Sequence, residues 1–303
     1  MALSPSKRIT PHRPRRQWSY FFLALPLMLL LVLVSYVPIG GWIVSLFDYR
    51  PGIPLFQSRF VGLELFKEIF RDRDILRALK NTVVFSGIQF VLQPLPMLFA
   101  IALSEISLSK YRRLVQTMTT LPHFISWVIV YALCFGLFSA NGLVNSLAGG
   151  AGAVRVLDNA GIVYTFQSAL FQWKDLGWNA IIYIAAIAGI DQQQYEAALI
   201  DGAGRLRSAW HITVPNLMPT FLVLALLNVA GFINTGYEQY FVFKNALVMN
   251  KIEVLDLYIY RMGLQLGDYS YATAVGILKS AVSLTMLFAV NALAKRVRGE
   301  SLI

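Results

Sequence analysis

The 303-residue sequence is too apolar for a soluble protein. Hydrophobic residues make up 57% and charged residues only 14%, against about 25% charged residues in soluble domains. Several runs of about 20 apolar residues can each cross a bilayer, and they predict an integral membrane protein made of helices. The formal charge of +10 gathers beside these runs, which indicates membrane orientation and not nucleic-acid binding. The single Cys134 excludes an internal disulfide, and His12, His123 and His211 share no metal-ligand spacing.

The apolar runs predict an all-α membrane protein with six transmembrane helices, which together form one transmembrane domain over 18–298. A basic arm at 1–17 precedes them and a short tail at 299–303 follows. The first run is too long for the apolar core of a signal peptide and no small-residue cleavage site follows it, so a retained helix is expected. The predicted spans are 18–47, 81–104, 114–138, 165–190, 217–234 and 272–293.

The segments between the spans carry weaker signals. Residues 63–79 can form an amphipathic helix at the membrane interface. The Gly- and Ala-rich segment 139–164 lacks the Gly-Lys-Ser/Thr ending of a phosphate-binding loop, so a flexible external loop is expected. Lys174 and Asp175 interrupt the fourth span and are expected at its outer interface. The segment 234–271 is expected to be external and polar.

Basic residues predict which side of the membrane each loop faces. Six spans place both chain ends on one side. Lysines and arginines collect in the arm 1–17, in the short loop 105–113, in the loop 191–216 and after the last span. By the positive-inside rule, both termini and the loop 191–216 should be cytoplasmic.

The loop 191–216 is the most informative stretch, and it contains YEAALIDGAGRLRSAWHITVP. The pattern predicts a short helix over 193–200, a turn at Asp201-Gly202 and a second helix over 205–211. Asp201 is a candidate cap for the second helix. The Glu-Ala-Ala string, followed at fixed spacing by Asp-Gly and by Ile-Thr-Val-Pro, resembles the EAA loop of type I ABC importer permeases. These are permeases of the maltose and methionine kind.

This resemblance implies a type I permease core and a chain that docks a separate ATPase through a cytoplasmic coupling helix. The expected partners are a second, homologous permease, two ATPase subunits that hold ATP and Mg²⁺, and an extracytoplasmic solute-binding protein. No cofactor and no enzymatic activity are expected on this chain. The resemblance also implies that it lies in the lipid of a bacterial cytoplasmic membrane. The implied ATPase-coupling residues are Glu196, Ala197, Ala198, Asp201, Gly202, Ala203, Gly204, Ile212 and Pro215.

Other strings narrow the resemblance to one branch of these permeases. They are FVGL at 60–63, GWN at 177–179, GYEQ at 236–239 and YATAVG at 271–276. These strings are similar to the LplB-like branch, which imports complex oligosaccharides, and the resemblance covers nearly all of 18–297. It implies an oligosaccharide substrate and a heterodimer of two permeases.

Sugars bind through aromatic faces and hydrogen-bonding amides, and polar groups inside membrane spans usually face a cavity. In maltose-type permeases the substrate contacts lie on the two helices that flank the EAA loop. Interfacial anchoring of the tryptophans and helix-to-helix hydrogen bonding by the asparagines are the alternatives. Lys279, deep in the last span, should snorkel, pair or line the pathway. The candidate pathway residues are Trp173, Trp178, Asn179, Asn228, Asn234, Thr235 and Glu238.

Three other functions stay open from the sequence. The first is an ABC permease for an amino acid, peptide or metal. The second is an ion-coupled secondary transporter, which would need carboxylates near the membrane midplane, where the predicted spans hold almost none. The third is a membrane enzyme, for which His123 beside Pro122 is the one candidate and has no visible partner in the sequence.

Overall fold

The computed structural model describes residues 15–150 and 154–298. Most of the predicted basic arm and the tail 299–303 lie outside the described residues. Within them the chain is almost entirely helical, with one two-residue hairpin formed by β1 (Phe47–Asp48) and β2 (Arg59–Phe60). The α-helices are α1 (Arg15–Leu31), α2 (Glu64–Ile69), α3 (Arg73–Leu92), α4 (Pro94–Ser104), α5 (Ser109–Thr120), α6 (Trp127–Phe138), α7 (Leu143–Leu147), α8 (Val163–Ala188), α9 (Gln192–Ile200), α10 (Arg205–Ser208), α11 (Val214–Ala230), α12 (Glu238–Phe243), α13 (Met249–Ile252), α14 (Leu255–Tyr260) and α15 (Tyr269–Arg298).

Five helical segments in the described residues are long and apolar enough to cross a membrane. They overlap five of the six predicted spans. Because several predicted spans continue into neighbouring turns without a break, the observed segments begin or end some residues away from the predicted limits. The five are Tyr20–Leu46, Arg73–Ser104, Trp127–Leu147, Arg205–Ala230 and Tyr269–Ala292.

The fourth predicted span, 165–190, corresponds to α8. Its 26 residues extend about 39 Å at 1.5 Å per residue, which is enough to cross the hydrocarbon core. Helix α8 is not among the five apolar segments because Lys174, Asp175 and two glutamines lower its mean hydropathy. A helix of this length with a polar face fits a position where that face turns toward a cavity.

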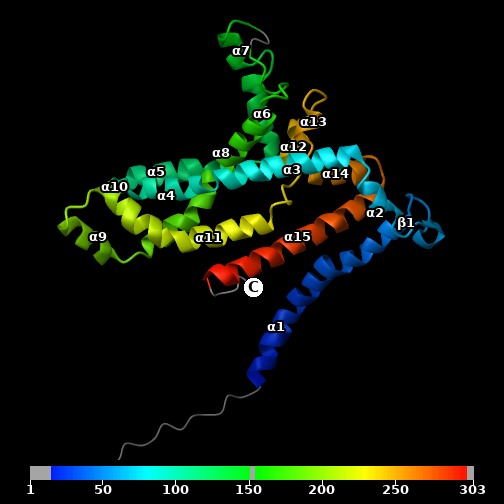
Figure 1. Cartoon of the computed structure of the whole chain (residues 1–303), viewed down its shortest axis with the longest axis horizontal. Helices are drawn as coiled ribbons and strands as arrows, with labels where there is room; N and C mark the ends of the chain where they lie inside the picture. Colours follow the sequence, from blue (N-terminus) through cyan, green and yellow to red (C-terminus); the bar gives the residue numbers. More distant parts are fainter. Residues whose placement is uncertain (1–14, 151–153, 299–303) are drawn as a thin grey trace, which may run out of the picture.

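The prediction of one continuous helix over the third span, 114–138, is wrong. Helix α5 ends at Thr120, and a 3-10 turn over Leu121–Phe124 follows it. Ser126 then caps α6, because its hydroxyl accepts a backbone N–H of that helix. Helix α5 lies along the bundle, whereas α6 and α7 turn steeply away from it (Figure 1). Pro122, which has no N–H to donate, falls inside this break.

The helix that corresponds to the second predicted span begins earlier in the chain than predicted. Helix α3 starts at Arg73, and Asp72 caps it by accepting from the Asp74 backbone N–H at 2.7 Å. The amphipathic helix predicted for 63–79 is therefore divided between α2 and the first turns of α3. The strong cap explains why α3 begins in a polar stretch that hydropathy assigns to a loop.

The polar character predicted for the external segment 234–271 is also wrong, since the segment folds into α12, α13 and α14 against α3. Its Glu253, Leu257 and Tyr258 are at most 1% exposed. Apolar residues at helical spacing, such as Val254, Leu257 and Tyr258, carry these short helices into two buried clusters. The polar residues between them mask this pattern in the sequence.

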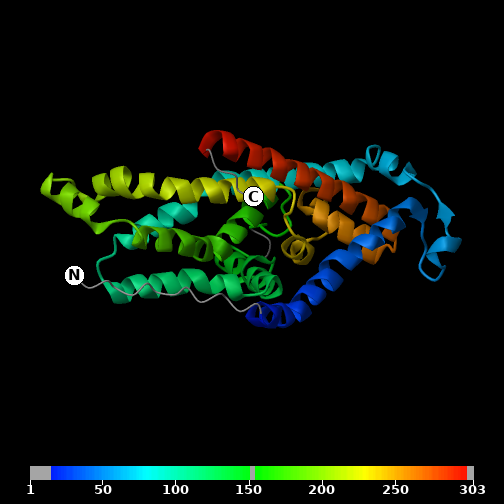
Figure 2. The ribbon, with the colours of Figure 1, turned by 90° about the horizontal axis from the view of Figure 1, so that it is seen from below.

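The two ends of the molecule are distinct. Helix α9 lies at one end, while the β1–β2 hairpin and α2 lie at the other (Figures 1 and 2). Helix α15 begins near the hairpin and runs toward the α9 end. Helix α1 diverges from the bundle in both views, and the apolar span Tyr20–Leu46 has none of its most apolar window buried.

Candidate functional site

Helices α9 and α10 form the loop that the sequence singles out, and they project at one end of the bundle (Figure 1). Asp191 caps α9 by accepting from the Gln193 backbone N–H at 3.0 Å. The turn that follows needs Gly202, whose φ of +75° lies in the left-handed region that disfavours other residues. The predicted helix–turn–helix arrangement of this loop is thus confirmed.

One predicted role in the loop is wrong. Asp201 does not cap the second helix, because Gly204 occupies that position and no side chain caps α10. Asp201 instead ends α9, where its backbone N–H donates to the carbonyl oxygens of the last turn. The tight turn at Gly202 ends α9 directly at Asp201, so the carboxylate stays exposed.

Most of the predicted coupling residues lie on the surface of the loop. Glu196, Ala197, Asp201, Gly202, Gly204 and Pro215 are exposed, whereas Ala198, Ala203 and Ile212 are partly buried. The sequence reasoning missed a group of large apolar side chains on the same surface. Their exposed fractions are 74% for Leu199, 87% for Ile200, 86% for Leu206 and 66% for Trp210. Four apolar side chains exposed on a loop this short are typical of a contact surface.

The loop is fastened to the bundle by two side-chain hydrogen bonds. The Tyr195 and Thr213 hydroxyls are 2.9 Å apart, and the Asn216 amide donates to Gln194 at 3.1 Å. Both bonds join α9 to the start of α11, while the chain from α8 enters α9 after only three residues. Helix α9 is therefore joined directly to both α8 and α11.

A cavity of about 460 Å³ lies between α3, α8 and α11 and the segment after α11. Its size falls in the range of small-molecule sites, roughly 300–1,000 Å³. Five of the seven predicted pathway residues line it together. They are Trp178, Asn179, Asn228, Asn234 and Thr235. The other two, Trp173 and Glu238, lie outside its lining, so for them the predicted assembly does not occur.

The cavity also contains polar residues that the sequence reasoning missed. The signal was present, because glutamines inside apolar helices are unfavourable without a polar partner or a cavity. Gln89, Gln93 and His123 lie outside the two helices that flank the EAA loop, and only the fold brings them to Gln172 and Asp175 of α8. These residues are Gln89, Gln93, Gln172, His123 and Asp175.

His123 has a partner, contrary to the expectation from sequence. Its Nδ1 lies 2.6 Å from an Asp175 carboxylate oxygen, and its ring stacks on Trp178 with centroids 4.4 Å apart and an interplanar angle of 2°. The two residues are far apart in the chain, which is why the pairing was invisible. The pair fixes the Trp178 ring at the cavity wall.

Lys174 is buried at 8% exposure and does not lie at an outer interface. Its ammonium donates to the His123 carbonyl oxygen and lies 5.5 Å from the Trp127 ring centroid. Because the carbonyl oxygens near Pro122 are freed by the break in the helix, they give this buried ammonium a partner. Lys174 therefore connects α8 to the turn after α5.

Lys279 takes one of its three expected roles, since it pairs with Asp256. Both side chains are largely buried, at 15% and 17% exposure. The second Asp256 oxygen accepts from the Gly236 backbone N–H at 2.9 Å, and Gly236 adopts a φ of +71°. This ion pair fastens the segment that carries Asn234 and Thr235 to α14 and α15.

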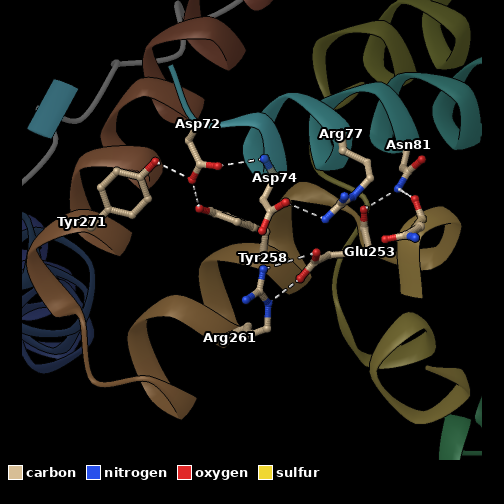
Figure 3. A network of polar contacts seen from close by, with 9 residues as sticks. Asp72, Asp74, Arg77, Asn81, Glu253, Tyr258, Arg261 and Tyr271 are labelled. Carbon is tan, nitrogen blue, oxygen red and sulfur yellow. Dashed lines mark hydrogen bonds and ion pairs between the residues drawn. The ribbon is translucent and has the colours of Figure 1, made fainter. Parts of the chain in front are cut away.

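Figure 3 shows a second polar network, away from the cavity, where α3, α14 and α15 meet. Tyr258 and Tyr271 both donate to one Asp72 oxygen. Nearby, the Arg261 guanidinium donates to buried Glu253 at 2.6 Å. Burial alone would raise the pKa of Asp72, but hydrogen bonds from Tyr258, the Asp74 backbone and Tyr271 lower it below the ordinary carboxyl value. Burial of the Tyr258 hydroxyl and its hydrogen bond to the Asp72 carboxylate raise the pKa of Tyr258.

In the part of the chain that the structure describes, no three His, Cys, Asp or Glu side chains gather as a metal site. The arrangement therefore offers two features of chemical interest. One is an aromatic and amide-lined cavity, and the other is an exposed apolar loop joined to the walls of that cavity.

Residues 94–299 match the family described as binding-protein-dependent transport system inner membrane component. The chain belongs to this family. The predicted all-helical permease fold is thereby confirmed, and the chain is a membrane component of a binding-protein-dependent transport system.

Two relatives from Bacillus subtilis (strain 168) align along nearly the whole chain. Protein LplB is 36% identical over 298 residues, covering 95% of this chain and 92% of LplB. The polygalacturonan/rhamnogalacturonan transport system permease protein YteP is 37% identical over 291 residues, covering 94% of this chain and 91% of YteP.

Among solved structures, a chain of a bacterial alginate ABC transporter in complex with an alginate pentasaccharide-bound periplasmic protein superposes with a TM-score of 0.85. It is 30% identical to this permease, and the alignment covers 95% of this chain and 98% of that chain. A second structure is that of a bacterial ABC transporter involved in the import of the acidic polysaccharide alginate. Its chain superposes with a TM-score of 0.84 at 31% identity, and the alignment covers 94% of this chain and 97% of that chain.

Proposed function

We propose that this permease forms half of the translocation pathway of an ATP-driven importer for an oligosaccharide. The observation that carries the proposal is the cavity, in which the Trp178 ring stands among side-chain amides. An aromatic face packs against the apolar face of a sugar ring, while amides donate to and accept from its hydroxyl groups. Relatives named for oligosaccharide transport support the same substrate class.

The proposal includes a second, homologous permease that completes the pathway, because this chain alone does not enclose the cavity. It also includes two ATPase subunits, each seated on a loop such as α9–α10, and an extracytoplasmic solute-binding protein at the hairpin end. The exposed apolar residues Leu199, Ile200 and Leu206 would supply the buried centre of the ATPase contact. In this orientation the α9 end and both termini face the cytoplasm, as the basic segments favour.

The pathway residues can be tested with two tryptophans of the same helix. Trp178 and Trp173 are similarly exposed, at 42% and 46%, but only Trp178 lines the cavity. In proteoliposomes containing the full transporter, Trp178→Ala should reduce uptake of a labelled oligosaccharide roughly tenfold or more. This is the loss expected for an aromatic side chain that the bound sugar covers. Trp173→Ala should retain most of the uptake.

Equal losses in the two variants, or none in either, would contradict the assignment of the cavity as the pathway. Uptake that needs no ATPase and follows an ion gradient would favour a secondary transporter instead.

A further inference from the structure

Side-chain amides dominate the polar part of the cavity wall. They come from the end of α3 and its junction with α4, from α8, and from α11 with the segment after it. An amide offers both donors and an acceptor, which is the combination a sugar hydroxyl requires. The amide residues are Gln89, Gln93, Gln172, Asn179, Asn228 and Asn234.

Two of these amides have hydrogen-bonding atoms without a partner among the described residues. Gln93 is only 9% exposed, yet neither its Nε2 nor its Oε1 is hydrogen-bonded. The Nε2 of Gln172 also has no hydrogen-bond partner among the described residues. Buried polar atoms are almost always satisfied, and less than 1 Å² of each of these atoms is exposed, so a hydroxyl in the cavity would become their partner after a side-chain rotation.

The charge of the wall is the second observation. No lysine or arginine lines the cavity in the described part of the chain, and its one carboxylate is Asp175. The nearby ammonium groups are engaged elsewhere, because Lys174 donates to the His123 carbonyl and Lys279 pairs with Asp256. A carboxylate in the cavity would therefore find no free cation on this wall, because the His123 imidazole is already paired with Asp175.

We infer that this wall selects uncharged sugar units, recognised through their hydroxyl groups, over uronate units. The inference rests on the proposed function and narrows its substrate class. It departs from the acidic polysaccharides in the descriptions of two similar transporters, alginate and polygalacturonan. The six amide residues of the cavity wall, Gln93 and Gln172 among them, form this subsite.

The test uses two probes that differ only at C6, α-1,4-linked galactobiose and α-1,4-linked digalacturonate. Binding to the full complex with its partner permease and ATPases is measured in nanodiscs by saturation-transfer NMR, without binding protein. Galactobiose should bind roughly tenfold or more tightly than digalacturonate, because only the uronate loses the hydration of a charge without gaining a free cation as partner. Equal or tighter binding of digalacturonate would overturn the inference, and so would binding of neither probe.

Two variants at one position separate charge from shape. Gln93→Lys introduces a cation at the wall and should reverse the preference toward digalacturonate. Gln93→Met keeps the length of the side chain but removes the amide, so galactobiose should bind more weakly with no gain for digalacturonate. A preference that stays unchanged in Gln93→Lys would show that this wall does not select charge.

Failure of this inference and failure of the proposed function can be told apart by ATPase stimulation in the same nanodiscs. A complex whose ATPase responds to a sugar-loaded binding protein, but which prefers digalacturonate, overturns only the neutral-sugar inference. A complex that binds neither probe and shows no stimulation overturns both.

Discussion

At the scale of single residues, Gly177 shows how closely the helices around the cavity pack. A Cβ at this position of α8 would lie 2.3 Å from the Thr119 carbonyl oxygen of α5. Small residues allow such close approach of helices in membranes. Trp178 follows directly in the chain, so the same contact helps to place the aromatic face of the cavity.

Gly177→Ala should destabilise the protein by about 1–3 kcal/mol, the usual range for overpacking, because α5 and α8 must separate. The matched control is Gly87→Ala in α3, where a Cβ would meet nothing within 4 Å. The yield of folded protein and the melting temperature in detergent measure the effect. Equal stability of the two variants would contradict this packing account.

Asp72 gives a prediction with a defined pH dependence. Burial would raise its pKa, but hydrogen bonds from Tyr258, the Asp74 N–H and Tyr271 lower it on folding. A carboxyl with a lowered pKa adds stability that is fully present above its unfolded pKa and lost as pH falls through the folded value. Asp72→Asn keeps the helix cap but loses the charge, and should cost about 1 kcal/mol at pH 7.

The difference in melting temperature between wild type and Asp72→Asn should be constant above about pH 5 and close below about pH 4. Asp74→Asn is the control, because its pair with Arg77 is exposed at 49% and 37% and adds little. A difference that persists unchanged at pH 3 would show that the Asp72 charge does not contribute.

His123 illustrates the limit of sequence reasoning at this scale. Trp178 and Asn228 could be proposed because sugar-binding residue types stand out in apolar helices. The partner of His123, however, is Asp175, 52 positions away, and only the break after α5 brings the two together. A pairing made by tertiary packing leaves no local signal in one sequence.

At the scale of elements, the loop α9–α10 is the best predicted part of the chain. Its Asp-Gly turn depends on local backbone preference, which sequence expresses directly. The helix predicted over 114–138 failed because the apolar run outweighed Pro122 and the capping Ser126. Likewise the sequence of α12, α13 and α14 predicts a polar loop, because short buried helices with polar residues resemble loops in hydropathy.

The α9 surface leads to a prediction for the ATPase contact. Ile200→Asp places a charge on a side chain that is 87% exposed, so the isolated permease should fold normally. If Ile200 lies at the centre of the ATPase interface, association should weaken roughly tenfold or more. Co-purification and titration of the ATPase against the permease complex measure the effect.

The control for this prediction is Phe56→Asp, between β1 and β2. Phe56 is similarly exposed, at 82%, and the hairpin lies at the opposite end of the molecule from α9 (Figure 1). Normal ATPase association in Ile200→Asp would remove the apolar surface of α9 from the proposed interface.

At the scale of the whole molecule, the cavity and the loop form one mechanical unit. Helix α8 enters α9, and α11 leaves the loop again, so both helices that carry pathway residues are joined to the proposed ATPase contact. The hydrogen bonds of Tyr195 and Gln194 to the start of α11 stiffen this junction. Movement of the loop would therefore alter the cavity walls directly.

The measurement that tests this account most directly is ATPase turnover of the complete transporter in nanodiscs. The sugar-loaded binding protein should raise turnover in wild type. Glu196→Lys and Gly202→Asp should abolish the stimulation, since one reverses a charge on the exposed α9 surface and the other places a side chain at a φ of +75°. If no ATPase associates with the permease, and the wild type transports sugar without one, the coupling account is contradicted.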